Sequence, residues 1–303
     1  MSIELLFFII AAMGIASKAF SKLCSNMISQ KSLASFSVVL IVNGIAACLF
    51  FYISSGFVLS INGATALYSL IYALVAGVSV VSNLIVYKYA SISNVTIISN
   101  SCGMFCTAIL GGIFFSEHVS GKTVLRLFIM LAAMILAFVD QKRNNHSNNA
   151  QKSSKKRSLL PLILIVIVIT ACGCANTVVL KAFSNSTKVT DENSFFFFTN
   201  VILCIGSGIV FAIACLRKRG ELKSSVLLLR PRRLVSVVGN TVCSNISSIV
   251  TVLIVAVMDV SLYSALSSAM GVLTGVIGSL LFKEKQGIFA YLAVVIACVA
   301  ILI

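Results

Sequence analysis

Long apolar runs separated by short polar connections recur along the whole chain. A helix needs about 20 apolar residues to cross a hydrocarbon core about 30 Å thick. The runs are continuous rather than alternating, which favours helices over the strands of a membrane barrel. The pattern therefore predicts ten membrane-spanning helices, at about residues 3–23, 35–54, 66–89, 93–116, 121–139, 159–183, 195–216, 234–258, 261–283 and 286–303.

Two of the predicted connections are long, residues 140–158 and residues 217–233. The first is basic, rich in Asn and Ser, and lies at the midpoint of the chain, which is typical of a flexible linker. The sequence thus divides into a five-helix half at 1–139, a linker at 140–158 and a second five-helix half at 159–303.

The composition agrees with this pattern. Of the 303 residues, 59% are hydrophobic and only 10% are charged, and the mean hydropathy is +1.08. A soluble domain carries about 25% charged residues. The sequence MSIELLFF begins with an acid rather than with the basic segment of a cleaved signal, so we expect the first run to remain as a helix. We predict an all-α integral membrane protein.

The net charge of +15 comes from 23 Lys and Arg that gather in the connections. This placement indicates loops at a membrane surface rather than nucleic-acid contacts. The side reached after the first, third, fifth, seventh and ninth spans holds 19 of them. The positive-inside rule makes that side cytoplasmic and predicts a multi-pass plasma-membrane protein with both termini outside. The opposite side holds Lys122, Arg126, Lys181 and Lys188.

The two halves share sequence. KAFS occurs at 18–21 and at 181–184, near the ends of the first and sixth spans, and SNSCGMFCTAILGGIFFSE at 99–117 aligns with LSSAMGVLTGVIGSLLFKE at 266–284. Because each half has five spans, the second half begins on the opposite side of the membrane. This predicts two inverted five-helix repeats, the architecture of many secondary transporters, with the substrate near the midplane. A duplication retained for packing alone is the alternative.

These features resemble the drug/metabolite transporter superfamily, specifically its ten-span EamA-like branch. Each half ends in a Gly-rich helix, an acidic corner (FFSE at 114–117, LFKE at 281–284) and a short final helix. The resemblance implies export or exchange of amino acids, metabolites, nucleotide sugars or drugs. It also implies that the third, fourth, eighth and ninth spans wall a central cavity. The usual Gly before the corner acid is Ser116 in one half and Lys283 in the other. The termini predicted to lie outside also differ from the cytoplasmic termini common in this branch.

The two repeated lysines, Lys18 and Lys181, have two interpretations. Each lies near a predicted helix end, so its ammonium group can extend to the membrane interface. Alternatively, the pair lines the entrance of a central cavity and attracts an anionic substrate from either side.

Amides and hydroxyls deep in the apolar runs are candidate substrate contacts, because a lipid-facing carboxamide is costly. The other interpretation is hydrogen bonding between helices, worth about 0.6–2 kcal/mol per contact. The candidates are Asn43, Asn83, Asn100, Asn200, Asn240 and Asn245, with Ser268 in the ninth span and with Tyr87 and Tyr263 as aromatic walls.

The remaining residues argue against other classes of chemistry. None of the eight Asp and Glu lies at the middle of a predicted span, where a proton relay is normally found. Ten Cys are scattered, and the two His lie in connections, so we expect no metal site. No phosphate-binding G-x-x-x-x-G-K-[ST] loop occurs. We therefore expect neither an enzyme nor a cofactor. The distribution of acids favours facilitated diffusion or exchange, or coupling at an ionisable group near a helix end.

The sequence as a whole predicts a secondary transporter that moves a small polar or amphipathic metabolite by alternating access, as a monomer or a homodimer. The competing hypothesis is a translocase for a lipid-linked carrier on the same scaffold.

Overall fold

The computed structural model describes residues 3–27, 33–86, 92–116, 121–149, 159–186, 191–217, 231–260 and 287–302, with short pieces between 262 and 277. Within these ranges the protein is α-helical and contains no strand. The helices are α1 (Ile3–Met27), α2 (Leu33–Ser54), α3 (Gly63–Val86), α4 (Ile92–Phe115), α5 (Gly121–Asn149), α6 (Leu159–Asn185), α7 (Glu192–Arg217), α9 (Pro231–Val257) and α11 (Ile288–Leu302).

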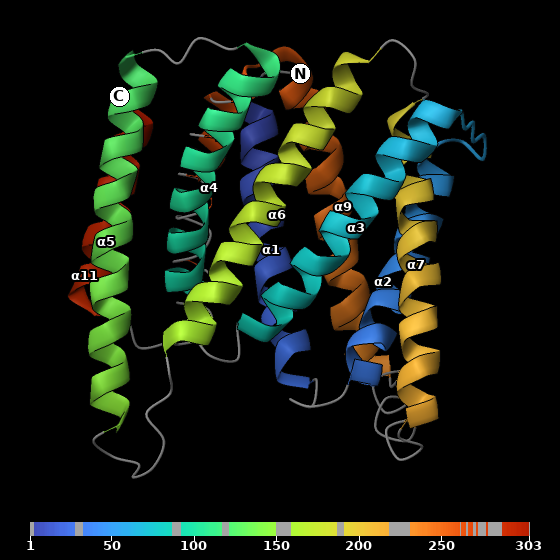
Figure 1. Ribbon diagram of the computed structural model, residues 1–303, viewed down its shortest axis with the longest axis horizontal. Helices are drawn as coiled ribbons and strands as arrows, with labels where there is room; N and C mark the ends of the chain where they lie inside the picture. Colours follow the sequence, from blue (N-terminus) through green and yellow to red (C-terminus); the bar gives the residue numbers. More distant parts are fainter. Residues whose placement is uncertain are drawn as a thin grey trace.

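Each of these helices coincides with one predicted span. The predicted span 261–283 is described at only a few residues, among them 262–264 and 266–268, and these are helical. A helix of 24 residues such as α3 is about 36 Å long, which is enough to cross a hydrocarbon core. From α1 to α9 each helix runs opposite to the one before it, α11 runs in the same direction as α9, and the two ends of the chain lie on the same face of the bundle (Figure 1).

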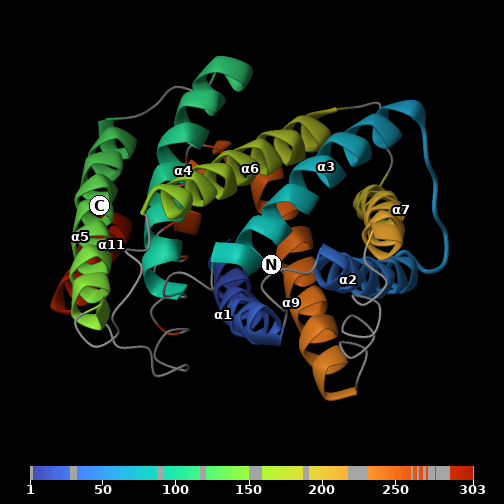
Figure 2. The same cartoon turned by 60° about the horizontal axis from the view of Figure 1, so that its bottom comes forward.

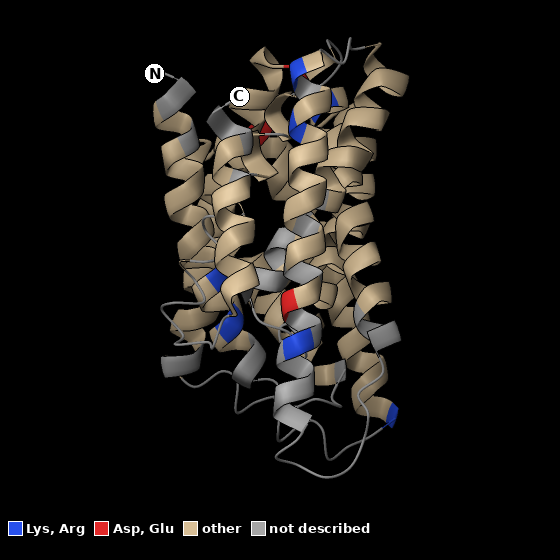
Figure 3. Cartoon of the chain, turned by 90° about the vertical axis from the view of Figure 1, so that its left-hand side faces the viewer, with Lys and Arg blue, Asp and Glu red and all other residues tan. Residues whose placement is uncertain are grey.

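The outside of the bundle is apolar. Large exposed side chains include Phe8, Leu74 and Ile113. The described charged residues lie on either side of an uncharged band that crosses the bundle (Figure 3). Among the described residues, five helices are long and apolar enough to cross a membrane, and two shorter stretches, Cys102–Phe115 and Val124–Ala133, are also apolar. The five long helices are Ala34–Ser54, Gly63–Asn83, Ile163–Asn185, Glu192–Arg217 and Leu234–Val257. This is a multi-pass membrane protein.

Four helix pairs make the most extensive contacts: α2 with α7, α1 with α9, α5 with α11, and α3 with α6. Helices α5 and α11 form one edge of the bundle and α2 and α7 the other, while the remaining helices lie between them (Figures 1 and 2). Stacked phenylalanines join α7 to α2 and to α6. Phe183 of α6 stacks on Phe195 of α7 with 4.3 Å between ring centroids, and Phe51 of α2 stacks on Phe196 at 5.0 Å.

Helix α5 corrects one prediction. Residues 140–149, expected to be flexible linker, continue the helix to Asn149. Tertiary contacts explain this extension. Asp140 is buried and accepts a hydrogen bond from the Gly287 amide at 3.4 Å, and the Arg143 guanidinium lies 5.3 Å from the centroid of the Phe289 ring. The carboxylate thus caps the start of α11, where the helix dipole favours a negative charge. Residues 150–158 lie outside the described part of the chain.

The contact between Asp140 and Gly287 yields a stability prediction. A Cβ atom at residue 287 would lie 1.9 Å from Asp140 Oδ1, so Gly287→Ala must displace the capping carboxylate. Asp140→Ala removes the same cap, at a cost of about 1 kcal/mol. We expect each single variant to lower the unfolding temperature in detergent. The unfolding temperature of the double variant should be little below that of Asp140→Ala, because the carboxylate that the new methyl group would displace is already absent. Fully additive losses would show that the two residues act independently.

Candidate functional site

A polar cavity of about 330 Å³ lies inside the bundle, among α1, α2, α3, α6 and α9. Most of the residues that line it carry hydroxyl, amide or ammonium groups, although the outside of the bundle is apolar. A cavity of this size corresponds to the small end of the range for ligand sites. Side chains that served only to join helices would be expected to fill such a space, so this cavity is the candidate site.

Helix α1 contributes a face of three polar side chains, Ser17, Lys18 and Ser21. The hydroxyls of Ser17 and Ser21 lie one turn apart, and each donates a hydrogen bond of 2.9 Å to Asn240 Oδ1 on α9. These two bonds join the first half of the chain to the second at the cavity wall. They also occupy the oxygen of the Asn240 carboxamide.

Lys18 lies within the bundle. It is nine residues before the last residue of α1, which corresponds to about 13 Å of helix. Its Nζ donates to the Gly271 carbonyl at 3.1 Å, and the side chain lines the cavity. The interpretation in which this ammonium group extends along the lipid boundary therefore does not describe Lys18.

Three further amides line the cavity. Asn43 Oδ1 on α2 accepts a hydrogen bond from the Thr241 hydroxyl on α9. Asn83 Nδ2 on α3 donates to the Ser79 carbonyl at 3.0 Å. Asn176 Oδ1 on α6 is buried and accepts no hydrogen bond in the described part of the protein. A buried acceptor normally has a partner, so the Asn176 oxygen is suited to a donor from a bound solute or water.

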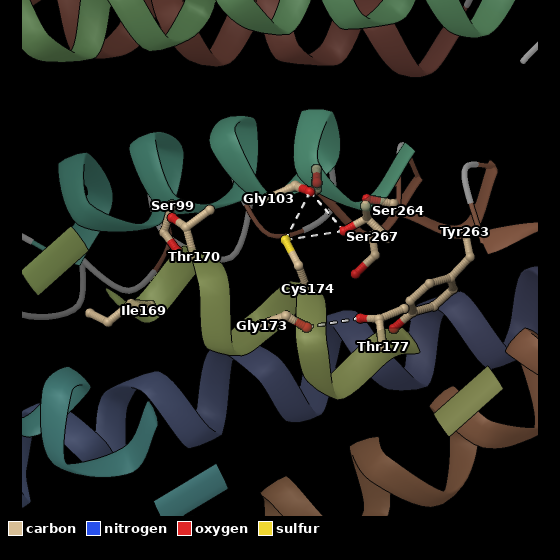
Figure 4. A pocket seen from close by; sticks show the side chains of 12 residues that line it. Ser99, Gly103, Ile169, Thr170, Gly173, Cys174, Thr177, Tyr263, Ser264 and Ser267 are labelled. Atoms are coloured by element: carbon tan, nitrogen blue, oxygen red, sulfur yellow. Dashed lines mark hydrogen bonds between the residues drawn. The ribbon is translucent and has the colours of Figure 1, made fainter. Parts of the chain in front are cut away.

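A second cavity of about 170 Å³ lies between α4, α6 and the helical residues that follow α9 (Figure 4). Thr107 donates to the Gly103 carbonyl at 2.7 Å and lies 3.4 Å from Cys174 Sγ, which is also 3.4 Å from the Gly103 carbonyl. Tyr263 and Ser268, both predicted site residues, line this cavity rather than the larger one. Helix α6 borders both spaces through neighbouring residues, Asn176 and Thr177.

The other predicted site residues have different surroundings. Lys181 is buried, and its Nζ donates to the carbonyls of Val255 at 2.7 Å and Met258 at 2.9 Å, at the end of α9. Asn200 donates to the Phe196 carbonyl of its own helix at 2.8 Å, and Asn245 is buried without lining either cavity. Tyr87 lies outside the described residues, as does the side chain of Asn100.

Asn200 belongs to the close contact between α2 and α7. A Cβ atom at Gly44 would lie 2.3 Å from Cys204 Sγ and 3.2 Å from the Asn200 carbonyl oxygen. Only a residue without a side chain allows this approach. Asn200 therefore lies at a packed helix interface, which is the alternative that the sequence left open.

Several residues of the cavity were not among those predicted from the sequence. Ser17 and Ser21 flank Lys18 at a spacing of one helical turn, a signal for a shared polar face. Asn176 lies deep in the apolar run of α6, where the cost of exposing an amide to lipid is the same as for the amides that were considered. Tyr72 lines the cavity from α3, but a tyrosine in an apolar run carries no comparable signal.

Comparison with known proteins gives a fold and no family. No protein-family model matches the chain, and no curated protein matches its sequence. Several solved structures are similar, among them a crystal structure with a TM-score of 0.60 and 13% sequence identity, over 98% of this chain and 94% of that one. At this identity the likeness shows a shared fold alone.

The hydrogen bonds of Asn240 give a prediction. Asn240→Ala should lower the free energy of unfolding by about 1–2 kcal/mol, because two interhelical bonds of about 0.6 kcal/mol are lost and two hydroxyls lose their acceptor. The double variant Ser17→Ala with Ser21→Ala should lower the free energy of unfolding by a similar amount. Adding Asn240→Ala to this double variant should lower it little further. Unfolding in detergent measures all three. Ser184→Ala is the control, because its hydroxyl bonds only within α6. Equal losses in the control and in Asn240→Ala would contradict the assignment.

Proposed function

We propose that the protein is a secondary transporter that carries a small polar or amphipathic metabolite across the cytoplasmic membrane by alternating access. The observation that carries this proposal is the polar cavity of about 330 Å³ inside a bundle with an apolar exterior. Polar groups within a membrane protein are costly unless they face partners, water or a substrate, and they commonly mark a substrate pathway.

The pattern of helix contacts supports an inverted repeat. If α1, α2, α3 and α5 correspond to α6, α7, α9 and α11, exchanging the halves maps the contacts onto one another. The pair α1–α9 becomes α6–α3, and α3–α7 becomes α9–α2, and all four contacts are present. The pairs α2–α7 and α5–α11 map onto themselves. Inverted repeats supply the two equivalent states that alternating access requires.

The position of the cavity fits the same proposal. Helices α1, α2 and α3 of the first half and helices α6 and α9 of the second half all contribute to its wall. In transporters with inverted repeats the substrate lies between the repeats, near the midplane. On this basis, together with the sequence motifs, we assign the chain to the drug/metabolite transporter superfamily and to its ten-span EamA-like branch, with 261–283 as the ninth span.

The orientation is part of the proposal. Helices α1, α3, α5 and α7 end on one face of the bundle, and both chain ends lie on the other (Figure 1). The connections that follow those four helices, together with the adjoining helix ends, carry most of the Lys and Arg, so we place that face in the cytoplasm and both termini outside.

The competing function, translocation of a lipid-linked carrier, has one observation in its favour. An apolar groove of about 450 Å³ lies between α2, α3 and α7, lined by side chains such as Leu40, Leu74 and Val210. Such a groove has the chemistry to accept an acyl or prenyl chain. Helix α3 presents Ser79 to the polar cavity and Ser82 to this groove.

These two serines provide a matched test of the pathway. The protein would be screened by thermal unfolding against amino acids, nucleosides, sugar phosphates, polyamines and cationic drugs, and counterflow of any stabilising compound would then be measured in proteoliposomes. Binding to the folded state stabilises it by about 2.7 kcal/mol at a hundredfold excess over the dissociation constant. We expect Ser79→Leu to reduce counterflow at least about tenfold, equivalent to about 1.4 kcal/mol, and Ser82→Leu to leave it nearly unchanged.

The reverse result, in which only Ser82→Leu reduces counterflow, would indicate that the substrate passes through the groove and would support translocation of a lipid-linked carrier. If no compound stabilises the protein or exchanges across the vesicle membrane, the proposal of a metabolite transporter is wrong.

A further inference from the structure

The two copies of KAFS place identical lysines in different surroundings. Lys181 Nζ binds the carbonyls of Val255 and Met258, which lie where α9 ends. The last carbonyls of a helix have no partner within it, and a cation is favoured there by the helix dipole. Lys181 therefore has a structural role, joining α6 to the end of α9.

Lys18 instead places its side-chain amine on the wall of the polar cavity. Its Nζ contacts the Gly271 carbonyl at 3.1 Å. The other described residues that line this cavity are uncharged. A cation within a membrane protein commonly marks an ion or substrate pathway, because burying its charge is costly.

Two amides beside Lys18 are arranged as donors. The Asn240 oxygen is held by Ser17 and Ser21, the neighbours of Lys18 on α1. The Asn43 oxygen is held by Thr241, the neighbour of Asn240 on α9. In both carboxamides the oxygen has a hydroxyl partner, and the NH₂ group can donate to a bound solute. An ammonium group with two amide donors is complementary to an oxyanion.

Two other amides, Asn83 and Asn176, belong to residues that line the same cavity. Asn83 uses its nitrogen to bond the Ser79 carbonyl, and Asn176 Oδ1 is the buried acceptor without a partner in the described part of the chain. Both oxygens are suited to hydroxyl, amine or amide donors on a solute. The cavity thus presents a cation with donors from α1, α2 and α9, and acceptors from α3 and α6.

We infer that the cavity binds a small soluble organic oxyanion, with its carboxylate or phosphate at Lys18, Asn43 and Asn240 and its hydrogen-bond donors at Asn83 and Asn176. This inference rests on the proposed function and narrows its substrate class. Lys18 is a binding residue, whereas its sequence counterpart Lys181 is not.

Matched pairs of compounds test the inference. Each pair differs only in the anionic group: an amino acid and its amide, a hydroxy acid and its amide, a sugar phosphate and the free sugar. Binding is measured by thermal stabilisation and by counterflow in proteoliposomes. We expect the anionic member to bind about tenfold to a hundredfold more tightly, since a hydrogen bond to a charged group is worth about that factor. The pair that shows this difference distinguishes a carboxylate from a phosphate substrate.

Variants then locate the preference. Lys18→Met should abolish the preference for the anionic member of each pair, and Lys18→Arg should retain part of that preference. Asn43→Asp, which places a negative charge among the donors while leaving Lys18 in place, should reverse it. Lys181→Met is the matched control and should lower the unfolding temperature without changing the preference.

Two outcomes would overturn the inference. The first is that uncharged or cationic compounds bind as tightly as the anions, and that Lys18→Met and Asn43→Asp leave this selectivity unchanged. If Ser79→Leu then still reduced the counterflow of those compounds, the proposal of a transporter would remain supported. Failure of every compound to bind or exchange would overturn both.

Discussion

The structure depends on one constraint, which is that hydrocarbon offers no partner to a polar group. Every backbone amide and carbonyl that crosses a membrane must be paired inside the protein, and this accounts for the long helices of the described chain. The same constraint sorts the side chains. Phe8, Leu74 and Ile113 are exposed on the outside, whereas Lys18, Asn43 and Asn240 point into the bundle. Packing, rather than exclusion of apolar groups from water, then holds the helices together, as in the close approach of α2 and α7 at Gly44.

Within that constraint, the two halves use similar sequences for different purposes. Lys181 donates hydrogen bonds to carbonyls at the end of α9, whereas Lys18 lines the polar cavity. This difference agrees with the proposed transporter in one of its two states, in which the two proposed repeats would adopt different conformations. Asp140 adds a second asymmetry. It holds the start of α11 from α5, and the structure therefore joins the last helices of the two halves at the cytoplasmic face of the proposed orientation.

Much of the fold could be predicted from the sequence, because the length of an apolar run fixes which residues cross the membrane. The inward position of Asn43 and Asn83 also follows, since an amide on the lipid side is costly. Hydropathy does not fix the rotation of a helix or its partners, however. The carbonyls that bind Lys181, the packing of Asn200 against α2 and the separate cavity at Tyr263 all depend on contacts between distant segments. The helical extension to Asn149 depends on Asp140 and Arg143, whose contacts with α11 no local pattern reveals.

Alternating access is the central claim, and distances between spin labels on the two faces test it most directly. Lys122 and Asn185 are exposed on one face and belong to different halves, and Arg143 and Arg217 are exposed on the other. Pulsed electron resonance in nanodiscs would measure both pairs, with and without a compound that stabilises the protein. The account predicts that the compound shifts the two distance distributions in opposite directions, as one face closes and the other opens. Distributions that stay fixed, or that widen together as in a channel, would contradict it.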